Sequence, residues 1–245
     1  SYLRDLGHND GLEQLIDAVE KIDGVKTARI LYLYPSTTTL NLIDKIADSK
    51  VFVNYFDMPL QHISQNMLKI MKRGKGAEKL IELMNYMKSK PNSFVRTTFI
   101  AGHPGESEED FEELCSFVEE FGFDRGNVFS YSDEEGTSAE TRDDKIEQEL
   151  IDERAEILGD IISQTTIKSL ENDIGKSFEV YIDGESQEHE YLLSARKTIW
   201  APQIDGEIYI NDNEDNIPII FGEIYEVEAT QLAGDKLLAK IIRKV

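Results

Sequence analysis

Cysteine is almost absent from this sequence, which has one among 245 residues. One cysteine excludes an intrachain disulfide framework and fits a reducing, cytosolic setting, so we expect a cytoplasmic protein. It also excludes a multi-cysteine zinc or iron–sulfur site made from these 245 residues alone. Cys115 lies on the apolar stripe of an expected helix, which predicts a core residue and not a nucleophile. No apolar run approaches the roughly 18–20 residues that span a bilayer, and no signal peptide is apparent, so no membrane partner is expected.

Basic residues are also scarce: 26 Lys and Arg stand against 48 Asp and Glu, and the formal net charge is −22. Nucleic acids are bound mainly through Lys and Arg at their phosphates, which such a charge disfavours. An acidic protein attracts basic proteins instead. The plainer alternative is that the charge serves solubility alone.

Strand-like and helix-like segments alternate up to about residue 170. Expected strands lie at 28–35, 51–59, 93–102 and 125–132, and expected helices at 11–22, 37–49, 64–74, 77–91, 107–123 and 145–171. Thr and Ser residues precede three of these helices as caps. The alternation predicts a parallel sheet with helices packed outside it, either open or closed as a barrel.

A different pattern begins near Asp173, where five short strands follow one another with turn residues between them. They lie at 176–184, 190–197, 206–212, 222–232 and 236–245. Five such strands predict a small closed antiparallel barrel, and residues 175–245 carry 14 acidic and 7 basic side chains, which sums to −7. We therefore divide the chain into domains at 1–171 and 172–245.

Polar and glycine-rich residues follow each of the four expected parallel strands, at the ends where such sheets gather their chemistry. Gln61 and His62 either contact a ligand or cap the helix that follows them. Gly102 either admits a ligand close to the backbone or forms a tight turn. Arg96 either holds a ligand carboxylate or pairs with an internal acid such as Asp57.

Several phrases in this order resemble one known family, the radical S-adenosylmethionine (SAM) methylthiotransferases. They are "YFDMPLQHIS", "LKIMKRG", "RTTFIAGHPGESEEDFEEL", "FDRGNVFSYSDEEGT" and "SARKTIWAPQIDGEIYI". The stretches "YSDEEGT" and "APQIDG" resemble the RimO type, which inserts a methylthio group at the β-carbon of an aspartate in the small-subunit ribosomal protein uS12. The MiaB type modifies a tRNA adenosine.

The resemblance implies an N-terminal cluster domain, a six-strand TIM-like radical SAM barrel and a C-terminal TRAM barrel. This chain matches barrel strands three to six, the linking helix and the TRAM domain, so its first strand is expected to be an unpaired edge. The CxxxCxxC loop of the family is absent. We therefore expect a C-terminal part of a longer enzyme, inactive alone, whose two 4Fe–4S clusters take their ligands from elsewhere.

The resemblance also implies a SAM pocket at the strand ends. The residues that it assigns to SAM are Gln61, His62, Arg96, Thr98, Ile100, Gly102, Val128, Phe129 and Tyr131. Those expected to face the substrate are Ser132, Glu134 and Glu135. His103 stands where family members often carry an aromatic residue, and its role is open. No catalytic residue and no metal ligand is assigned within this chain.

Charge bears on the choice of substrate. A tRNA-modifying TRAM domain needs a basic face, whereas an acidic one steers a basic ribosomal protein, so tRNA is the less favoured partner. Four cations could still cluster into a local basic patch: Arg196, Lys197, Arg243 and Lys244. The alternatives to the RimO-type enzyme are a MiaB-type tRNA enzyme and a non-catalytic TRAM binding module.

Overall fold

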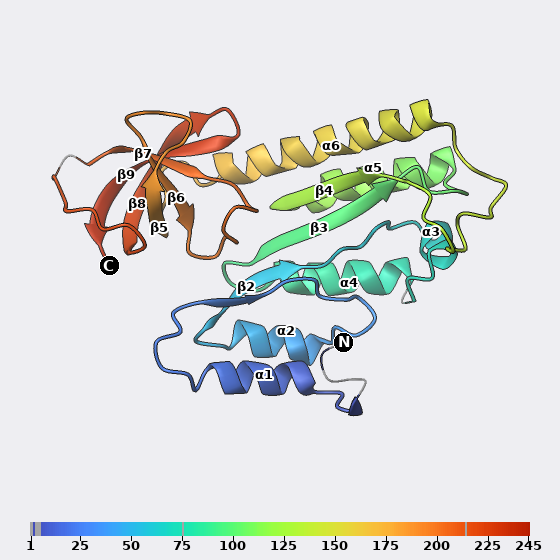
Figure 1. Ribbon diagram of the computed structural model, residues 1–245, viewed down its shortest axis with the longest axis horizontal. Coiled ribbons are helices and arrows are strands. Elements are labelled where there is room, and N and C mark those ends of the chain that lie inside the picture. Colours follow the sequence, from blue (N-terminus) through green and yellow to red (C-terminus); the bar gives the residue numbers. More distant parts are fainter. Residues whose placement is uncertain (1, 3–5, 75, 214) are drawn as a thin grey trace. The chain divides into compact units, whose positions relative to one another are not determined.

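The computed structural model describes residues 2, 6–74, 76–213 and 215–245 (Figure 1). The chain divides into two compact units, residues 1–165 and 166–245. No helix in the described parts of the chain combines the length and the apolar composition needed to cross a bilayer.

The first unit contains a parallel sheet of four strands, as the alternation predicts. The strands are β1 (Ala28–Ile30), β2 (Phe52–Asp57), β3 (Phe94–Ala101) and β4 (Arg125–Ser130), and they neighbour one another in that order. The helices are α1 (Gly11–Val19), α2 (Leu40–Ala47), α3 (Gln65–Ile70), α4 (Ala77–Lys88), α5 (Glu108–Phe121) and α6 (Gln148–Glu171). Within the described residues β1 pairs with β2 alone, which leaves its other side as a sheet edge.

Strand β1 is shorter than the predicted strand 28–35. Tyr32 has a φ of 59°, a left-handed conformation that a strand does not accommodate. Its backbone N–H turns instead to the Asp57 carboxylate, at 3.2 Å. The chain therefore leaves the sheet soon after Ile30, under the influence of a side chain on the neighbouring strand.

Helices α2, α4 and α5 cover one face of the sheet (Figure 1). Strand β3 shows how the two faces differ, because Thr97 and Phe99 are fully buried on the helix side, where Phe99 packs edge-on against Phe123. Arg96 and Thr98, one residue out of step, belong to the other face. That face carries the polar side chains of the sheet.

Three helices begin at hydroxyl caps, as the sequence predicts. Thr39 accepts from the backbone N–H of Leu42, and Ser64 does the same for α3. Ser107 forms a complete capping box with Asp110 at the start of α5. These caps fix where the chain turns from a strand end into the next helix.

The second unit is a closed five-stranded barrel. Its strands are β5 (Ser177–Glu185), β6 (Leu193–Lys197), β7 (Ile208–Asp212), β8 (Ile224–Ala233) and β9 (Lys236–Lys244), in the order β5-β6-β7-β9-β8. The prediction of a wholly antiparallel barrel is wrong at one pairing, because β7 and β9 are parallel. In the strand order β9 lies between β7 and β8, and its antiparallel pairing with β8 makes it run in the same direction as β7.

Candidate cofactor and substrate pocket

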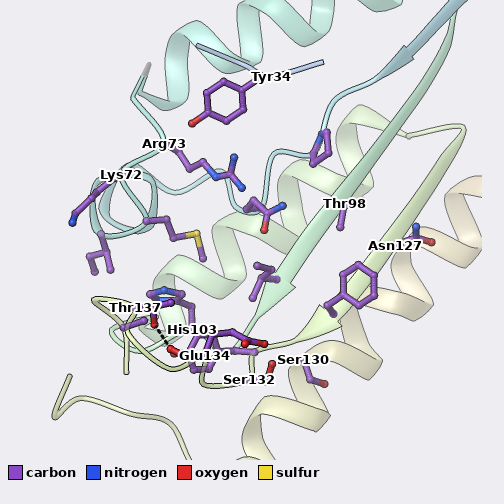
Figure 2. Close-up of a pocket in the computed structure, with 18 of the residues that line it drawn as sticks. Tyr34, Lys72, Arg73, Thr98, His103, Asn127, Ser130, Ser132, Glu134 and Thr137 are labelled. Atoms are coloured by element: carbon purple, nitrogen blue, oxygen red, sulfur yellow. Dashed lines mark hydrogen bonds between the residues drawn. The ribbon is translucent and has the colours of Figure 1, made fainter. Parts of the chain in front are cut away.

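A pocket of about 780 Å³ lies where the four parallel strands end (Figure 2). Eight of the twelve residues predicted for the site line it: Gln61, Arg96, Thr98, Ile100, Phe129, Tyr131, Ser132 and Glu134. Four do not: His62, Gly102, Val128 and Glu135. The segments after all four strands thus meet at one cavity, although which ligand each residue contacts stays a prediction.

Arg96, the least exposed charged residue of the lining, forms the floor of the pocket and belongs to a buried ion pair. Arg96 donates through Nη1 to Oδ1 of Asp57 at 3.1 Å, and Asp57 is fully buried. In the amide orientation that satisfies both of its polar atoms, Asn127 accepts from Nη2 of Arg96 at 2.7 Å. Of the two possibilities for Arg96, the structure therefore shows the pairing with Asp57. A guanidinium held on two sides presents a fixed polar surface to the cavity.

Gln61 adopts a left-handed backbone conformation, with φ of 70°. Its N–H donates to Thr98 and its carbonyl accepts from Ile100, both at 2.9 Å, so the backbone joins β3 as an isolated bridge. Such a conformation costs a non-glycine residue on the order of 1–3 kcal/mol and persists only where its surroundings enforce it. The strain places the Gln61 side chain in the pocket.

Successive residues of strand β4 point to opposite faces of the sheet. Asn127 and Phe129 line the pocket, and Phe129 is 59% exposed, which is high for a phenylalanine on a sheet. Val128 lies on the opposite face and packs against the hydrophobic core. Its predicted place in the pocket is wrong, and the period of two along a strand is the signal that distinguishes it from its neighbours.

His62 is fully buried and does not reach the pocket, contrary to the predicted place at its lip. Its Nδ1 accepts from the backbone N–H groups of Ile63 and Ser64, both at 3.0 Å, so it secures the turn before α3. Its Nε2 has no hydrogen-bond partner among the described residues and lies 3.8 Å from Oε2 of Glu106. Burial lowers the pKa of His62 to about 4.

Gly102 also lies outside the pocket lining, because it faces α6. A Cβ at this position would lie 2.6 Å from Cγ1 of Ile151, and its φ is +80°. Its N–H donates to the carboxylate of Glu106 at 2.8 Å. The close approach predicted for this glycine is therefore real, but the partner is a helix of the same chain. Glu135 is exposed and likewise lies outside the lining.

Glu106 connects this loop to α6 through a buried ion pair. Arg154, 4% exposed, donates to Oε1 of Glu106 at 3.0 Å and to Glu108 at 2.9 Å. Burial raises the pKa of Glu106, and the neighbouring Arg154 partly offsets the rise. The pair thus fixes the loop after β3, which forms part of the pocket wall, to α6.

His103 lines the pocket, and its ring lies 5.0 Å from that of Tyr131, edge to face. Its Nδ1 lies 2.9 Å from the Pro104 carbonyl, and burial lowers its pKa. A neutral imidazole at neutral pH then serves as a flat wall element, the place that an aromatic residue would fill.

The sequence interpretation missed a further part of the pocket wall. It comprises Tyr32 and Tyr34 after β1, Met71, Lys72 and Arg73 after α3, and Asn127 on β4. The phrase "LKIMKRG" carries part of the family resemblance, and its three cations in an acidic chain were the available signal.

Among the described residues, no group of three or more His, Cys, Asp or Glu side chains is arranged to bind a metal ion. Cys115 packs partly buried against the core, and burial raises the pKa of its thiol to about 11. It is therefore a protonated packing residue at neutral pH, as predicted.

The possible basic patch of the barrel is neutralised by acidic side chains. Each of the four cations forms an ion pair: Arg196 with Asp183, Lys197 with Asp173, Arg243 with Glu226 and Lys244 with Glu223. Interleaved pairs of this kind do not present the free positive face that a phosphate backbone needs.

Two protein families match separate parts of the chain. The radical SAM superfamily matches residues 6–118, and the TRAM domain matches residues 174–242. By sequence the chain therefore belongs to the radical SAM proteins that carry a TRAM domain. A solved structure of Escherichia coli coproporphyrinogen III oxidase, a radical SAM enzyme, is a distant likeness, with 18% identity and a TM-score of 0.47 over 67% of this chain and 37% of that one.

Curated relatives narrow the family. Proteins named ribosomal protein uS12 methylthiotransferase RimO are 77% identical in Aliarcobacter butzleri, 59% in Sulfurovum sp. and 53% in Campylobacter jejuni, over 99–100% of this chain. The chain belongs to this RimO family, as its motifs indicate. It spans 55% of the length of each of these relatives.

Proposed function

We propose that this chain supplies the SAM pocket and the TRAM domain of a methylthiotransferase that modifies an aspartate of ribosomal protein uS12. The observation that carries the proposal is the convergence of four strand ends on one pocket, in a chain 77% identical to a protein of that name. The substrate, and with it a cytoplasmic location, follows from the names of the relatives.

The pocket suits SAM in size and in chemistry. Its volume of about 780 Å³ lies within the roughly 300–1,000 Å³ range of small-molecule sites. Phe129 offers an exposed ring face to a planar base. Gln61, Thr98 and the Arg96 guanidinium supply polar groups for an amino acid moiety and a ribose.

When bound beside a reduced 4Fe–4S cluster, SAM supplies the radical that removes a substrate hydrogen, and it also supplies the methyl group. This chain's own residues bind and orient the ligand and keep water from the reacting atoms. With one cysteine, these 245 residues do not provide the ligands of either of the two clusters expected in the family. The complete activity therefore requires cysteines from outside this sequence.

The charge of the second unit supports a protein substrate. The barrel sums to −7, and its cations that could have formed a basic patch are paired with carboxylates. Such a surface attracts a basic ribosomal protein and raises its association rate. No feature of the described residues favours tRNA.

Two measurements test the proposal. Calorimetry of this chain with SAM should detect binding that Phe129→Ala weakens and that Glu135→Ala, outside the pocket, leaves unchanged. Cluster-reconstituted protein containing these residues should then replace one hydrogen of a uS12 aspartate by a methylthio group, as mass spectrometry of the digested product reports. Modification of tRNA instead, with binding that weakens steeply as salt rises, would assign the chain to the tRNA-modifying type. Binding of uS12 without SAM binding or modification would leave a non-catalytic module.

A further inference from the structure

Two consecutive cations, Lys72 and Arg73, line the pocket in a chain whose net charge is −22. Among the described residues neither forms an ion pair, although acidic side chains outnumber basic ones almost two to one. Arg96 on the floor is satisfied by Asp57, so it does not fill the same role. A cation left without a carboxylate in such a chain is suited to an anionic ligand.

Arg73 is held in place from two sides. Helix α3 ends in a Schellman motif, in which the N–H of Arg73 donates to Leu68 at 2.8 Å and that of Lys72 to Lys69 at 3.2 Å. Lys72 takes the left-handed position of this motif, with φ of 56°, where glycine is the usual residue. The Arg73 guanidinium lies 5.7 Å from the centre of the Tyr34 ring.

Figure 2 shows Arg73 beside Tyr34 on one side of the cavity, and Ser132 and Glu134 on the far side. The Glu134 carboxylate would repel an anion placed next to it, which favours the Arg73 side for a carboxylate. Lys72 is exposed and Arg73 half-buried, so this wall forms the rim of the cavity, whereas Arg96 on the floor is only 9% exposed. A side chain of a folded polypeptide reaches a rim more readily than a floor.

We propose that Arg73 binds the side-chain carboxylate of the substrate aspartate and thereby selects the residue that enters the pocket. The inference rests on the proposed function and adds a specificity-determining residue to it. A guanidinium offers two parallel N–H groups to both oxygens of a carboxylate, and the Tyr34 ring and the Schellman motif hold it ready for that geometry.

A double-mutant cycle tests the contact. Binding is measured between a cluster-reconstituted protein that contains these residues, saturated with SAM, and a uS12 peptide that spans the modified aspartate. The second ligand is the same peptide with that aspartate replaced by asparagine. We expect Arg73→Gln to weaken binding of the aspartate peptide about ten- to hundredfold, as for a charged hydrogen-bonded pair. The asparagine peptide should bind the wild type as weakly as the aspartate peptide binds Arg73→Gln. Its own affinity should not fall further in Arg73→Gln.

Lys69→Gln is the matched control, because it removes one positive charge from the same helix at an exposed position outside the pocket lining. It should change the affinity for the peptide less than about threefold. Arg73→Lys keeps the charge without the two-pronged geometry and should recover only part of the affinity.

Two results would overturn the assignment of Arg73 while leaving the proposed function intact. One is equal affinity of the wild type for both peptides, and the other is a weakened affinity for SAM itself in Arg73→Gln, which would give the guanidinium to the cofactor carboxylate. If the wild type binds neither peptide and modifies no uS12, the proposed function fails together with this inference.

Discussion

Replacing Gly102 by alanine tests how the pocket wall is held against α6. The added Cβ would meet three atoms of Ile151 at 2.6, 2.8 and 2.9 Å, all closer than side chains pack. None of these atoms is the free end of a long side chain, and Ile151 is itself 5% exposed in the packed interface. The helix or the loop must therefore move.

The cost has two parts. A left-handed conformation costs an L-residue with a Cβ about 1–2 kcal/mol, and overpacking a close contact typically costs about 1–3 kcal/mol. Together they predict a loss of about 2–5 kcal/mol in the free energy of unfolding. With a urea dependence of about 2 kcal/mol per molar, the midpoint should fall by about 1–2.5 M.

Urea unfolding followed by far-UV circular dichroism measures this loss, because the helices that the structure describes, α1 to α6, lie between residues 11 and 171. Gly159→Ala is the control, since it makes the same change within α6, where a Cβ would meet nothing within 4 Å. That variant should gain about 0.5–1 kcal/mol from helix propensity. An unchanged midpoint for Gly102→Ala, or one as high as that of Gly159→Ala, would refute the argument from close contact.

Three further predictions concern residues outside the pocket lining. The pKa of His62 is depressed to about 4, so its contribution to stability is present above its ordinary pKa of 6.5 and is lost as the pH falls towards 4. In unfolding measured between pH 7 and pH 4, His62→Asn should remove about 3 kcal/mol of this pH dependence. An equally steep dependence in the variant would exclude His62 as its source. Arg154→Met leaves the buried Glu106 carboxylate unpaired and should lower the free energy of unfolding by about 3–5 kcal/mol. In the same urea assay, adding Glu106→Gln should restore most of this loss, whereas additive losses would argue against the pair. Ser107→Ala removes the capping box of α5 and should cost about 1 kcal/mol in thermal unfolding, whereas no shift of the midpoint would show that Asp110 caps the helix alone.

Local signals predicted the fold well. The helix starts at Thr39, Ser64 and Ser107 follow from a hydroxyl before an amphipathic run, and the structure places caps at all three. The parallel sheet follows from alternation alone, because a helical crossover brings each strand back in the same direction. Both are encoded within a few neighbouring residues.

Features set by distant residues were not predictable in this way. Strand β1 ends early because the Asp57 carboxylate takes the N–H of Tyr32, 25 residues away in sequence. Gly102 approaches Ile151 of α6, and no residue near the glycine in the sequence indicates that contact. The parallel pairing of β7 with β9 depends on where β8 lies, which no single strand pattern encodes.

The candidate site shows the same division between local and distant causes. Alternation along β4 would have separated Val128 from Phe129, so that error lay within reach of the sequence. The burial of His62 was not predictable from the sequence, because a histidine after a strand serves a ligand and a backbone turn equally well. Arg73 could not be singled out from the sequence, because only the folded chain shows that it forms no ion pair among the described residues.

The pocket owes its shape to charges that its ligand would not touch. Asp57 holds Arg96 on the floor, and Arg154 holds Glu106 behind the wall, where the Glu106 carboxylate also accepts the N–H of Gly102. Both carboxylates are buried, so removing either partner leaves a charge that water does not reach. Such pairs add little to net stability compared with apolar packing, but each fixes its partner in a single position. The expected benefit is a pocket that is already shaped before the ligand arrives, which lowers the entropic cost of binding.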